Sequence, residues 1–186
     1  MKPHATYITP EIRKLGKRDI SKITGHFLRL DRKTRSARFG TVIKDAVIKN
    51  YAEHVISADT LVFGAFVDGE LRAIGELRGL LETCPPDAEL ALSVEPDWQE
   101  KGIGSTLFSR LMSASQNRGI KTLHVFFSNE NKTMQSIAAR HHPEVTLSGG
   151  QIEATIDPPW ATPWSYAREM AEDTIAYFRQ IFQITA

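Results

Sequence analysis

An Asp-Gly turn between two strand-like runs constrains the topology of this chain more than any other feature. Residues 60–67 (TLVFGAFV) are rich in β-branched and aromatic side chains, which favour strands. Asp68 and Gly69 follow at once, and this pair is a strong hairpin signal. Residues 70–80 are expected to return as a second strand, and residues 89–94 alternate as a third. The sequence therefore predicts three consecutive antiparallel strands in the middle of the chain.

Helical patterns flank these strands. Apolar residues recur at helical spacing in residues 17–30, 42–54, 103–117, 131–141 and 164–182. Residues 122–127 form a strand entered from a helix, so it should run parallel to the strand before Pro96. Residues 145–147 and 151–156 look like a closing hairpin over Ser-Gly-Gly. Strands interleaved with helices predict an α+β, or mixed α/β, fold.

The length of 186 residues suits one domain. We expect a core over about 7–157 and a helical extension over about 160–186. A single cysteine, Cys84, excludes an intrachain disulfide and favours a reducing, cytoplasmic compartment. The N-terminus lacks the apolar segment of a secretory signal, and no run approaches 18 apolar residues, so no membrane partner is expected.

The net charge of +1 hides an uneven distribution. Residues 1–50 hold 13 Lys and Arg against four Asp and Glu, whereas residues 51–186 hold 10 against 18. The basic run 29–38 lacks interleaved aromatic residues, which favours a solvated helix end over a nucleic-acid site. His141 and His142 have no third ligand at metal spacing nearby, so no metal is expected.

The loop before the helix 103–117 carries the most chemical information. It contains Gln99-Glu-Lys-Gly102-Ile-Gly104, with two glycines at the start of the helix. Glycine allows close approach of a ligand, and the first amides of a helix attract anions such as phosphate. Lys101 adds a full positive charge. A glycine turn that merely caps the helix is the alternative, and the spacing matches neither GxGxxG nor GxxxxGK[ST].

The pattern Gln99-x-x-Gly102-x-Gly104, after a strand ending Val94-x-Pro96, resembles motif A of the GNAT acetyltransferase superfamily. The resemblance covers roughly residues 60–142. Residues 27–39 (FLRLDRKTRSARF) are similar to a segment of bacterial GNAT domains related to protein-lysine acetyltransferases. The resemblance implies the GNAT fold: a mixed, mostly antiparallel sheet whose fourth and fifth strands run parallel but splay apart, flanked by helices, here with an extra C-terminal helix.

The resemblance also implies acetyl-CoA as co-substrate. The residues implied to contact it are Leu92, Ser93, Val94, Gln99, Glu100, Lys101, Gly102, Ile103, Gly104, Ser105 and Asn131. Asn131 could also be a simple helix N-cap residue, and both roles are compatible.

Family chemistry is direct attack of an amine on the thioester. The resemblance assigns the backbone amide of about Val94 to the thioester oxygen, and Glu89 is the first candidate for the general base. Glu76 on the preceding strand is the second, and the alternative is an ordinary solvated glutamate on a strand. The position of the family's usual Tyr, seven residues after Asn131, is Ala138, so the proton donor for the thiolate is left open.

Two functions are therefore compatible with the sequence. The first is N-acetylation of a primary amine, either a small molecule or a protein lysine, and the second is an acyl-CoA-binding sensor without catalysis. Acidic residues without Lys or Arg in 87–100 would attract a cationic amine. Trp160 and Trp164 are expected to pack the last helix onto the domain, with an acceptor-site or homodimer contact as alternatives.

Overall fold

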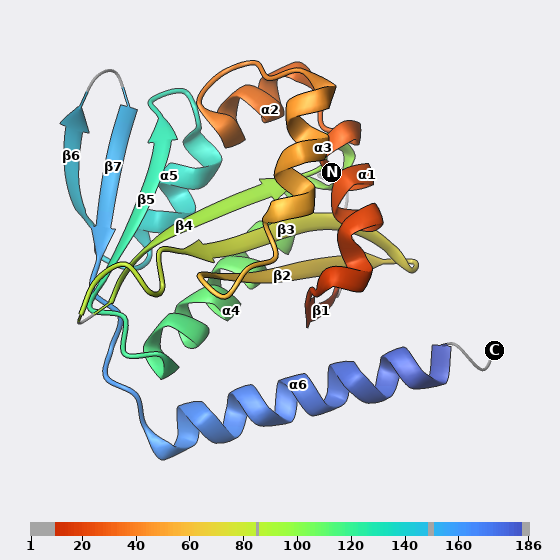
Figure 1. Cartoon of the computed structure of the whole chain (residues 1–186). Coiled ribbons are helices and arrows are strands. Elements are labelled where there is room, and N and C mark those ends of the chain that lie inside the picture. The colour runs from red at the N-terminus through yellow and green to blue at the C-terminus, as the bar shows by residue number, and fades with distance from the viewer. Residues whose placement is uncertain (1–9, 85, 149–150, 184–186) are drawn as a thin grey trace, which may run out of the picture.

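The computed structural model describes residues 10–84, 86–148 and 151–183 (Figure 1). Its strands form one seven-stranded sheet in the order β1-β2-β3-β4-β5-β7-β6. The strands are β1 (Glu11–Lys14), β2 (Thr60–Val67), β3 (Glu70–Arg78), β4 (Asp87–Val94), β5 (Thr122–Ser128), β6 (Glu144–Ser148) and β7 (Gln151–Ile156). Only β4 and β5 pair in parallel. The mixed α/β fold expected from the sequence is confirmed, including the Asp68-Gly69 hairpin, whose two turn residues have φ of 51° and 75°.

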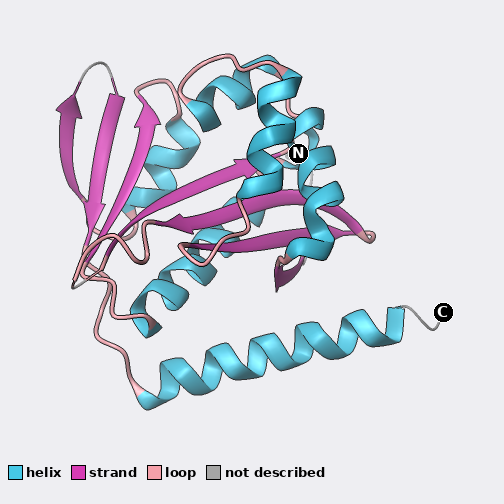
Figure 2. Cartoon of the chain, in the orientation of Figure 1, coloured by secondary structure: helices cyan, strands magenta, loops and turns pink. Residues whose placement is uncertain are grey.

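Helices cover both faces of this sheet (Figure 2). They are α1 (Ile20–Arg29), α2 (Arg32–Phe39), α3 (Asp45–His54), α4 (Ile103–Asn117), α5 (Lys132–Ala139) and α6 (Pro163–Gln183), with short 3-10 turns η1 (Lys17–Asp19) and η2 (Pro96–Trp98). The turn residues expected between β6 and β7, Gly149 and Gly150, lie outside the described residues, as does Pro85.

The core has two parts, one on each side of the sheet. Ile23 and Phe27 of α1 and Ile48 of α3 pack with Val62 and Ile74. On the other side, α4 packs with apolar residues of β2 to β5 and α5. The close approach of α4 depends on Gly75, because a Cβ there would lie 2.6 Å from Leu111 Cδ1. This packing holds the N-terminus of α4 beside the end of β4.

Two elements were not expected from the sequence. The four-residue strand β1 is too short for an alternating pattern to identify it. Helix α2 occupies the run expected as a connector, and it has no buried residue, so hydrophobic periodicity could not detect it. Local signals define it instead: Asp31 accepts a hydrogen bond from Thr34 N at 2.7 Å, and Gly40 ends the helix with φ of 73°.

Helix α6 forms where it was expected, but the packing predicted for its tryptophans is wrong. Trp160 and Trp164 are 93% and 84% exposed. The contacts between α6 and the rest of the chain run to α4 and β1 through mostly polar side chains.

Candidate functional site

The sheet opens between β4 and β5. The two strands pair only through Asp87, Ala88 and Glu89 of β4, whereas β5 continues along β7 to Ser128. The rest of β4 pairs with β3 alone, and Glu95 N donates to Arg72 O at 3.0 Å. Because hydrogen-bonding direction alternates along an antiparallel pair, the N–H groups of Leu92 and Val94 point away from β3. They therefore face the opening where β5 has diverged, as the expected splay requires (Figure 1).

The N-terminus of α4 lies next to this opening. Gly102 is its N-cap, with φ of 83° and without a side-chain cap, so the first helix amides have no such partner. A Cβ at Gly104 would lie 3.6 Å from Val94 and 3.5 Å from Ile137. The small residue thus lets the helix start sit between the end of β4 and α5. This arrangement presents amide donors and the positive end of the helix dipole to a ligand.

A cleft of about 2390 Å³ joins these features. It is lined by nearly all of the residues predicted to contact the cofactor: Leu92, Ser93, Val94, Gln99, Glu100, Lys101, Gly102, Gly104, Ser105 and Asn131. The side chain of Ile103 instead belongs to the core. Asn131 caps α5, since its Oδ1 accepts from Met134 N at 3.0 Å, and it lines the cleft as well.

The basic run 29–38 lies at the cleft rather than forming a simple solvated helix end. Residues of α2, among them Arg32 and Lys33, line the cleft together with Lys101, Lys132 and Arg140. In total the lining has seven Lys and Arg against four Asp and Glu. This charge suits a ligand with several phosphate oxygens. Of the acidic residues in 87–100, only Glu89 and Glu100 reach the lining.

The two predicted base candidates have different surroundings. Glu89 lines the cleft, pairs with Arg78 and keeps 38% of its side chain exposed. Glu76 is completely buried and does not contribute to the lining. Its carboxylate accepts from Arg38 Nη2 at 2.6 Å and from the Tyr51 hydroxyl.

Glu76, Arg38 and Tyr51 form a hydrogen-bonded cluster, the Glu76 cluster, in which the carboxylate affects the pKa of both partners. Burial and the charge of Glu76 raise the pKa of Tyr51 to about 12. Burial alone would lower the pKa of Arg38, but the negative charge of Glu76 outweighs this effect and raises it. Arg38 comes from α2 and Tyr51 from α3, so the cluster ties both helices to β3 beneath the cleft.

A buried hydrogen-bonded chain leads from the cleft to a second carboxylate. Ser93 Oγ lies 2.8 Å from His26 Nε2, and His26 Nδ1 lies 3.3 Å from Glu95 Oε1. Burial lowers the pKa of His26, against the opposing effect of Glu95. Burial also raises the pKa of Glu95, but hydrogen bonds from His26, Arg29 and Arg72 outweigh it and lower this pKa to about 2.

Because Glu95 is ionised, the donor and acceptor of each hydrogen bond between Ser93, His26 and Glu95 are fixed. A carboxylate can only accept, so Nδ1 of a neutral His26 carries the proton and Nε2 is the acceptor. The Ser93 hydroxyl then donates to His26. The remaining lone pairs of Ser93 can accept a hydrogen bond from a donor in the cleft.

This cluster predicts acid sensitivity. The folded-state pKa values of His26 and Glu95 lie below their unfolded values of about 6.5 and 4.3. At a pH between the folded and the unfolded pKa of either group, the unfolded chain therefore binds more protons than the folded chain. We expect stability to fall as the pH drops below about 6.5, by up to about 1.4 kcal/mol per pH unit for His26, and again from about 4.3 towards 2 for Glu95. Urea unfolding of His26→Gln between pH 8 and 5 should show a smaller first loss, because what remains comes from His141, whose pKa is also lowered by partial burial and by Arg140. His54→Gln, at an exposed site, should keep the full loss. An identical slope in His26→Gln and the wild type would contradict this assignment.

Sequence reasoning missed His26, the arginines around Glu95, and the Arg38–Tyr51 pair. The one available signal was His26 itself, a polar residue within the apolar stripe of α1 between Ile23 and Phe27. The partners come from segments far apart in the sequence, so no local pattern joins them.

Within the described ranges, no cluster of three or more His, Cys, Asp or Glu side chains could hold a metal ion. The described helices also include none that is both long and apolar enough to cross a membrane. No described tyrosine lines the cleft, and Ala138, at the family's usual Tyr position, is buried.

Comparison with known proteins agrees with this geometry. Solved structures of the same fold include the GNAT domain of S. lividans PAT, at 17% identity and a TM-score of 0.67, covering 84% of this chain and 99% of that one. The PaiA N-acetyltransferase from Thermoplasma acidophilum, in complex with coenzyme A, has 20% identity and a TM-score of 0.60 over 81% and 99% of the two chains. YncA, a putative acetyltransferase from Salmonella typhimurium with acetyl-CoA, has 15% identity and a TM-score of 0.63 over 83% and 97%.

The sequence itself matches the model of the Acetyltransferase (GNAT) family over residues 27–141, a range that contains α2 to α5 and every lining residue of the cleft except Gln151. The chain belongs to the GNAT acetyltransferase family.

Proposed function

We propose that this protein transfers an acetyl group from acetyl-CoA to a primary amine by direct attack while both are bound in the cleft. The observation that carries the proposal is the meeting of three features in one cleft: the open backbone of β4, the start of α4 and the carboxylate of Glu89. Pockets for a single drug-sized ligand measure about 300–1,000 Å³. The cleft volume of about 2390 Å³ supports binding of cofactor and acceptor together.

Acetyl-CoA would supply an activated acyl group as a thioester. The amides of residues 103–105 and Lys101 would hold its phosphates, and the basic side chains of α2 and α5 would add charge. Two structural neighbours carry coenzyme A or acetyl-CoA, which supports this ligand.

The amine nitrogen would form a C–N bond to the acetyl carbon as the C–S bond breaks, and the departing thiolate would take up the second proton that the nitrogen releases. The chain's own residues assist this transfer. The N–H of Val94 would donate to the thioester oxygen as negative charge develops there. Glu89 would take a proton from the incoming ammonium, because it is the carboxylate of the two candidates that reaches the cleft. Glu76 is the weaker candidate, because two strong partners already occupy it. Ser93 would accept a hydrogen bond from the amine N–H and so orient the nitrogen.

The glycine at the helix start gives a test of cofactor binding. Gly102→Ala places a Cβ at φ of 83°, which costs about 1–2 kcal/mol and shifts the first helix amides. We expect the Kd for coenzyme A, measured by calorimetry, to rise roughly tenfold. Gly69→Ala is the matched control, because its φ is 75° in a hairpin outside the cleft. It should lose similar stability without weakening binding, and equal affinity in both variants would count against the proposed phosphate site.

An acyl-CoA-binding sensor is the second candidate, favoured by the absence of a described tyrosine from the cleft. Thiol release from acetyl-CoA separates the two functions. The purified protein would be assayed with small primary amines, lysine peptides and intact proteins. Amine-dependent thiol release supports the enzyme, whereas tight coenzyme A binding without release for any acceptor supports the sensor.

A further inference from the structure

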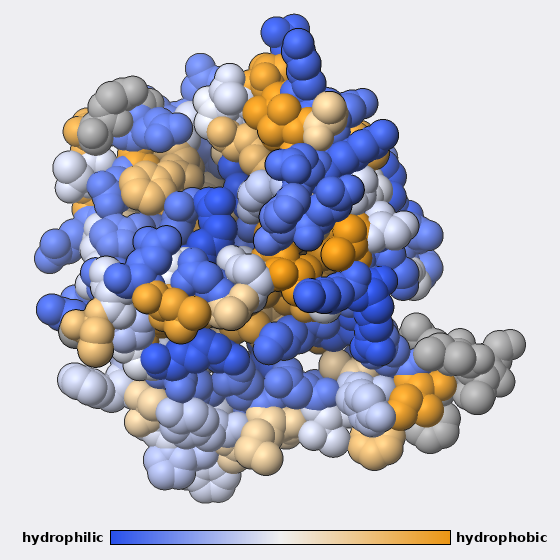
Figure 3. Space-filling view, viewed as in Figure 1, coloured by the Kyte–Doolittle hydropathy of each residue, from blue (hydrophilic) through white to orange (hydrophobic). Residues whose placement is uncertain are grey.

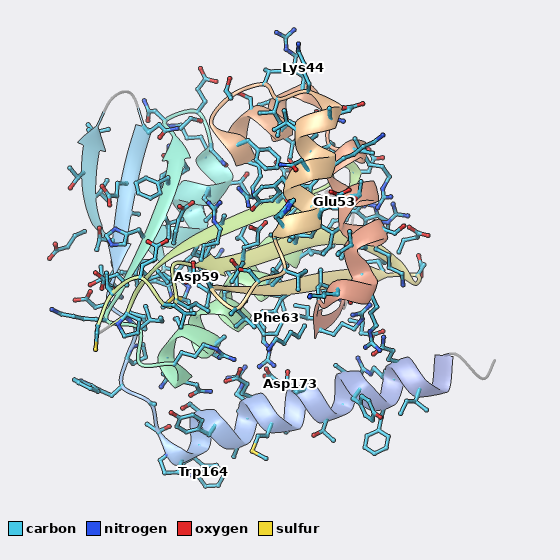
Figure 4. The ribbon with its side chains drawn as sticks, viewed as in Figure 1. Lys44, Glu53, Asp59, Phe63, Trp164 and Asp173 are labelled. Atoms are coloured by element: carbon cyan, nitrogen blue, oxygen red, sulfur yellow. The ribbon has the colours of Figure 1, made fainter. Side chains whose placement is uncertain are left out.

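Helix α6 turns its polar face toward the domain. Arg110 of α4 pairs with Glu172 and Asp173, and Arg118 pairs with Glu169 at 3.0 Å. Figure 4 shows Asp173 on the side of α6 that faces the sheet and Trp164 on the side that points away. This orientation is the reverse of the usual one, in which a surface helix buries its apolar stripe.

The opposite face of α6 is apolar and exposed. Six large side chains outside the domain-facing side are between 40% and 84% exposed: Trp164, Met170, Ile175, Tyr177, Phe178 and Ile181. At about 200 Å² for a fully exposed side chain of this size, their solvent-exposed area is roughly 700 Å². Hydrophobic residues are visible along this edge in Figure 3. Monomeric proteins seldom expose a patch larger than about 300–600 Å².

The centre of this face has the spacing of a coiled-coil seam. Its residues alternate at intervals of three and four: Trp164, Ala167, Ala171, Thr174, Phe178 and Ile181. Heptad spacing lets one helix pack its side chains between those of another. The seam is about 26 Å long.

The order of side chains along the seam suits antiparallel pairing with a second copy of α6. If two copies of α6 run antiparallel about a two-fold axis between residues 172 and 173, Trp164 lies opposite Ile181. Ala167 then lies opposite Phe178, a small residue against a large one, and the centre pairs Ala171 with Thr174. A parallel pair would instead oppose Trp164 with Trp164 and Ala167 with Ala167, which fills space less evenly.

We propose that the exposed face of α6 binds the same face of a second copy of this chain in an antiparallel homodimer. The exposed area of roughly 700 Å² lies within the range of about 600–1,000 Å² that each partner contributes to a standard interface. A membrane surface fits less well, because such helices carry Lys and Arg on their polar face. Here that face carries Glu169, Glu172 and Asp173, which are bound to the domain. The cleft lining includes no described residue of α6, so this inference does not depend on the proposed function.

Sedimentation equilibrium of the full chain over a range of concentrations tests the proposal. The wild type should sediment as a dimer, and Ala171→Glu should raise the dimer Kd at least about 100-fold by placing a charge in the seam. Arg179→Gln changes the net charge by the same −1 on the same helix but off the seam, and should remain dimeric. Trp164→Glu at the end of the seam provides a second disrupting variant, and unchanged circular dichroism shows that each variant is folded.

Disulfide trapping in a Cys84→Ser background tests the orientation. Copies carrying Trp164→Cys should cross-link with copies carrying Ile181→Cys but not with each other, because two residues 164 would lie about 26 Å apart. A wild type that is monomeric throughout overturns the proposal, as does a dimer unaffected by Ala171→Glu. Monomeric protein that cosediments with vesicles of anionic phospholipid would assign the face to a membrane instead.

Discussion

Replacing Arg38 with methionine is expected to lower the free energy of unfolding by about 3–5 kcal/mol. Arg38 is 4% exposed, and its guanidinium is the cationic partner of the fully buried Glu76. Removing it leaves a buried carboxylate whose one remaining hydrogen-bond partner among the described residues is the Tyr51 hydroxyl. Breaking a buried pair costs much more than an ordinary surface change because the remaining charge stays desolvated. Denaturant unfolding measures the loss.

A double variant separates the buried charge from simple loss of packing. Arg38→Met with Glu76→Gln removes the charge while keeping an acceptor for Tyr51, and should recover most of the stability lost in Arg38→Met. Arg32→Met, an exposed position on the same helix, should change stability by no more than about 0.5 kcal/mol. If the stability losses of the two single variants simply add in the double variant, Arg38 and Glu76 are not energetically coupled, and this account is refuted.

Replacing Glu89 with glutamine is expected to lower kcat by roughly 100- to 1,000-fold while leaving the Kd for coenzyme A unchanged. Glutamine keeps the size of the side chain and its contact with Arg78 but cannot take a proton from an ammonium group. The pair with Arg78 is half-exposed, so the variant should fold normally. Steady-state thiol release together with calorimetric binding of coenzyme A measures the two effects separately.

Asp87→Asn is the matched control for Glu89. Asp87 lies two residues earlier in β4, on the same face, and does not line the cleft. Its kcat should equal that of the wild type. Unchanged turnover in Glu89→Gln would show that Glu89 is not the general base. A loss of coenzyme A binding would instead assign Glu89 a structural role.

Much of the fold could be predicted because its signals are local. The Asp68-Gly69 turn, the alternation in β4 and the apolar stripe of α4 each depend on neighbouring residues, and the structure has these elements at nearly the expected bounds. Helix α2 escaped detection because it contributes no buried apolar residue to the core, and its one deeply placed side chain is the charged Arg38. An apolar stripe in the sequence also does not show whether it faces the core or the solvent, and in α6 the stripe faces outward.

The candidate site was likewise predictable where its signals are local, and not where it joins residues far apart in the sequence. The glycine loop and the end of β4 were recognisable by their resemblance to the GNAT family, and the structure brings both to the cleft. The support beneath it was not, because Arg38, Tyr51 and Glu76 come from three separate elements. The charge of the cleft was also misjudged: Glu95 pairs with Arg29 and Arg72, while residues of α2 bring positive charge to the lining.

The most direct test follows the acetyl group itself. Protein with bound, isotopically labelled acetyl-CoA would be mixed with an amine acceptor, stopped at intervals and examined by mass spectrometry. The proposed mechanism predicts that label appears on the amine nitrogen at the same rate as free thiol, with no labelled protein at any time. Labelled protein that precedes the product would contradict direct attack in a ternary complex, and acetyl-CoA that stays intact with every acceptor would contradict acetyl transfer altogether.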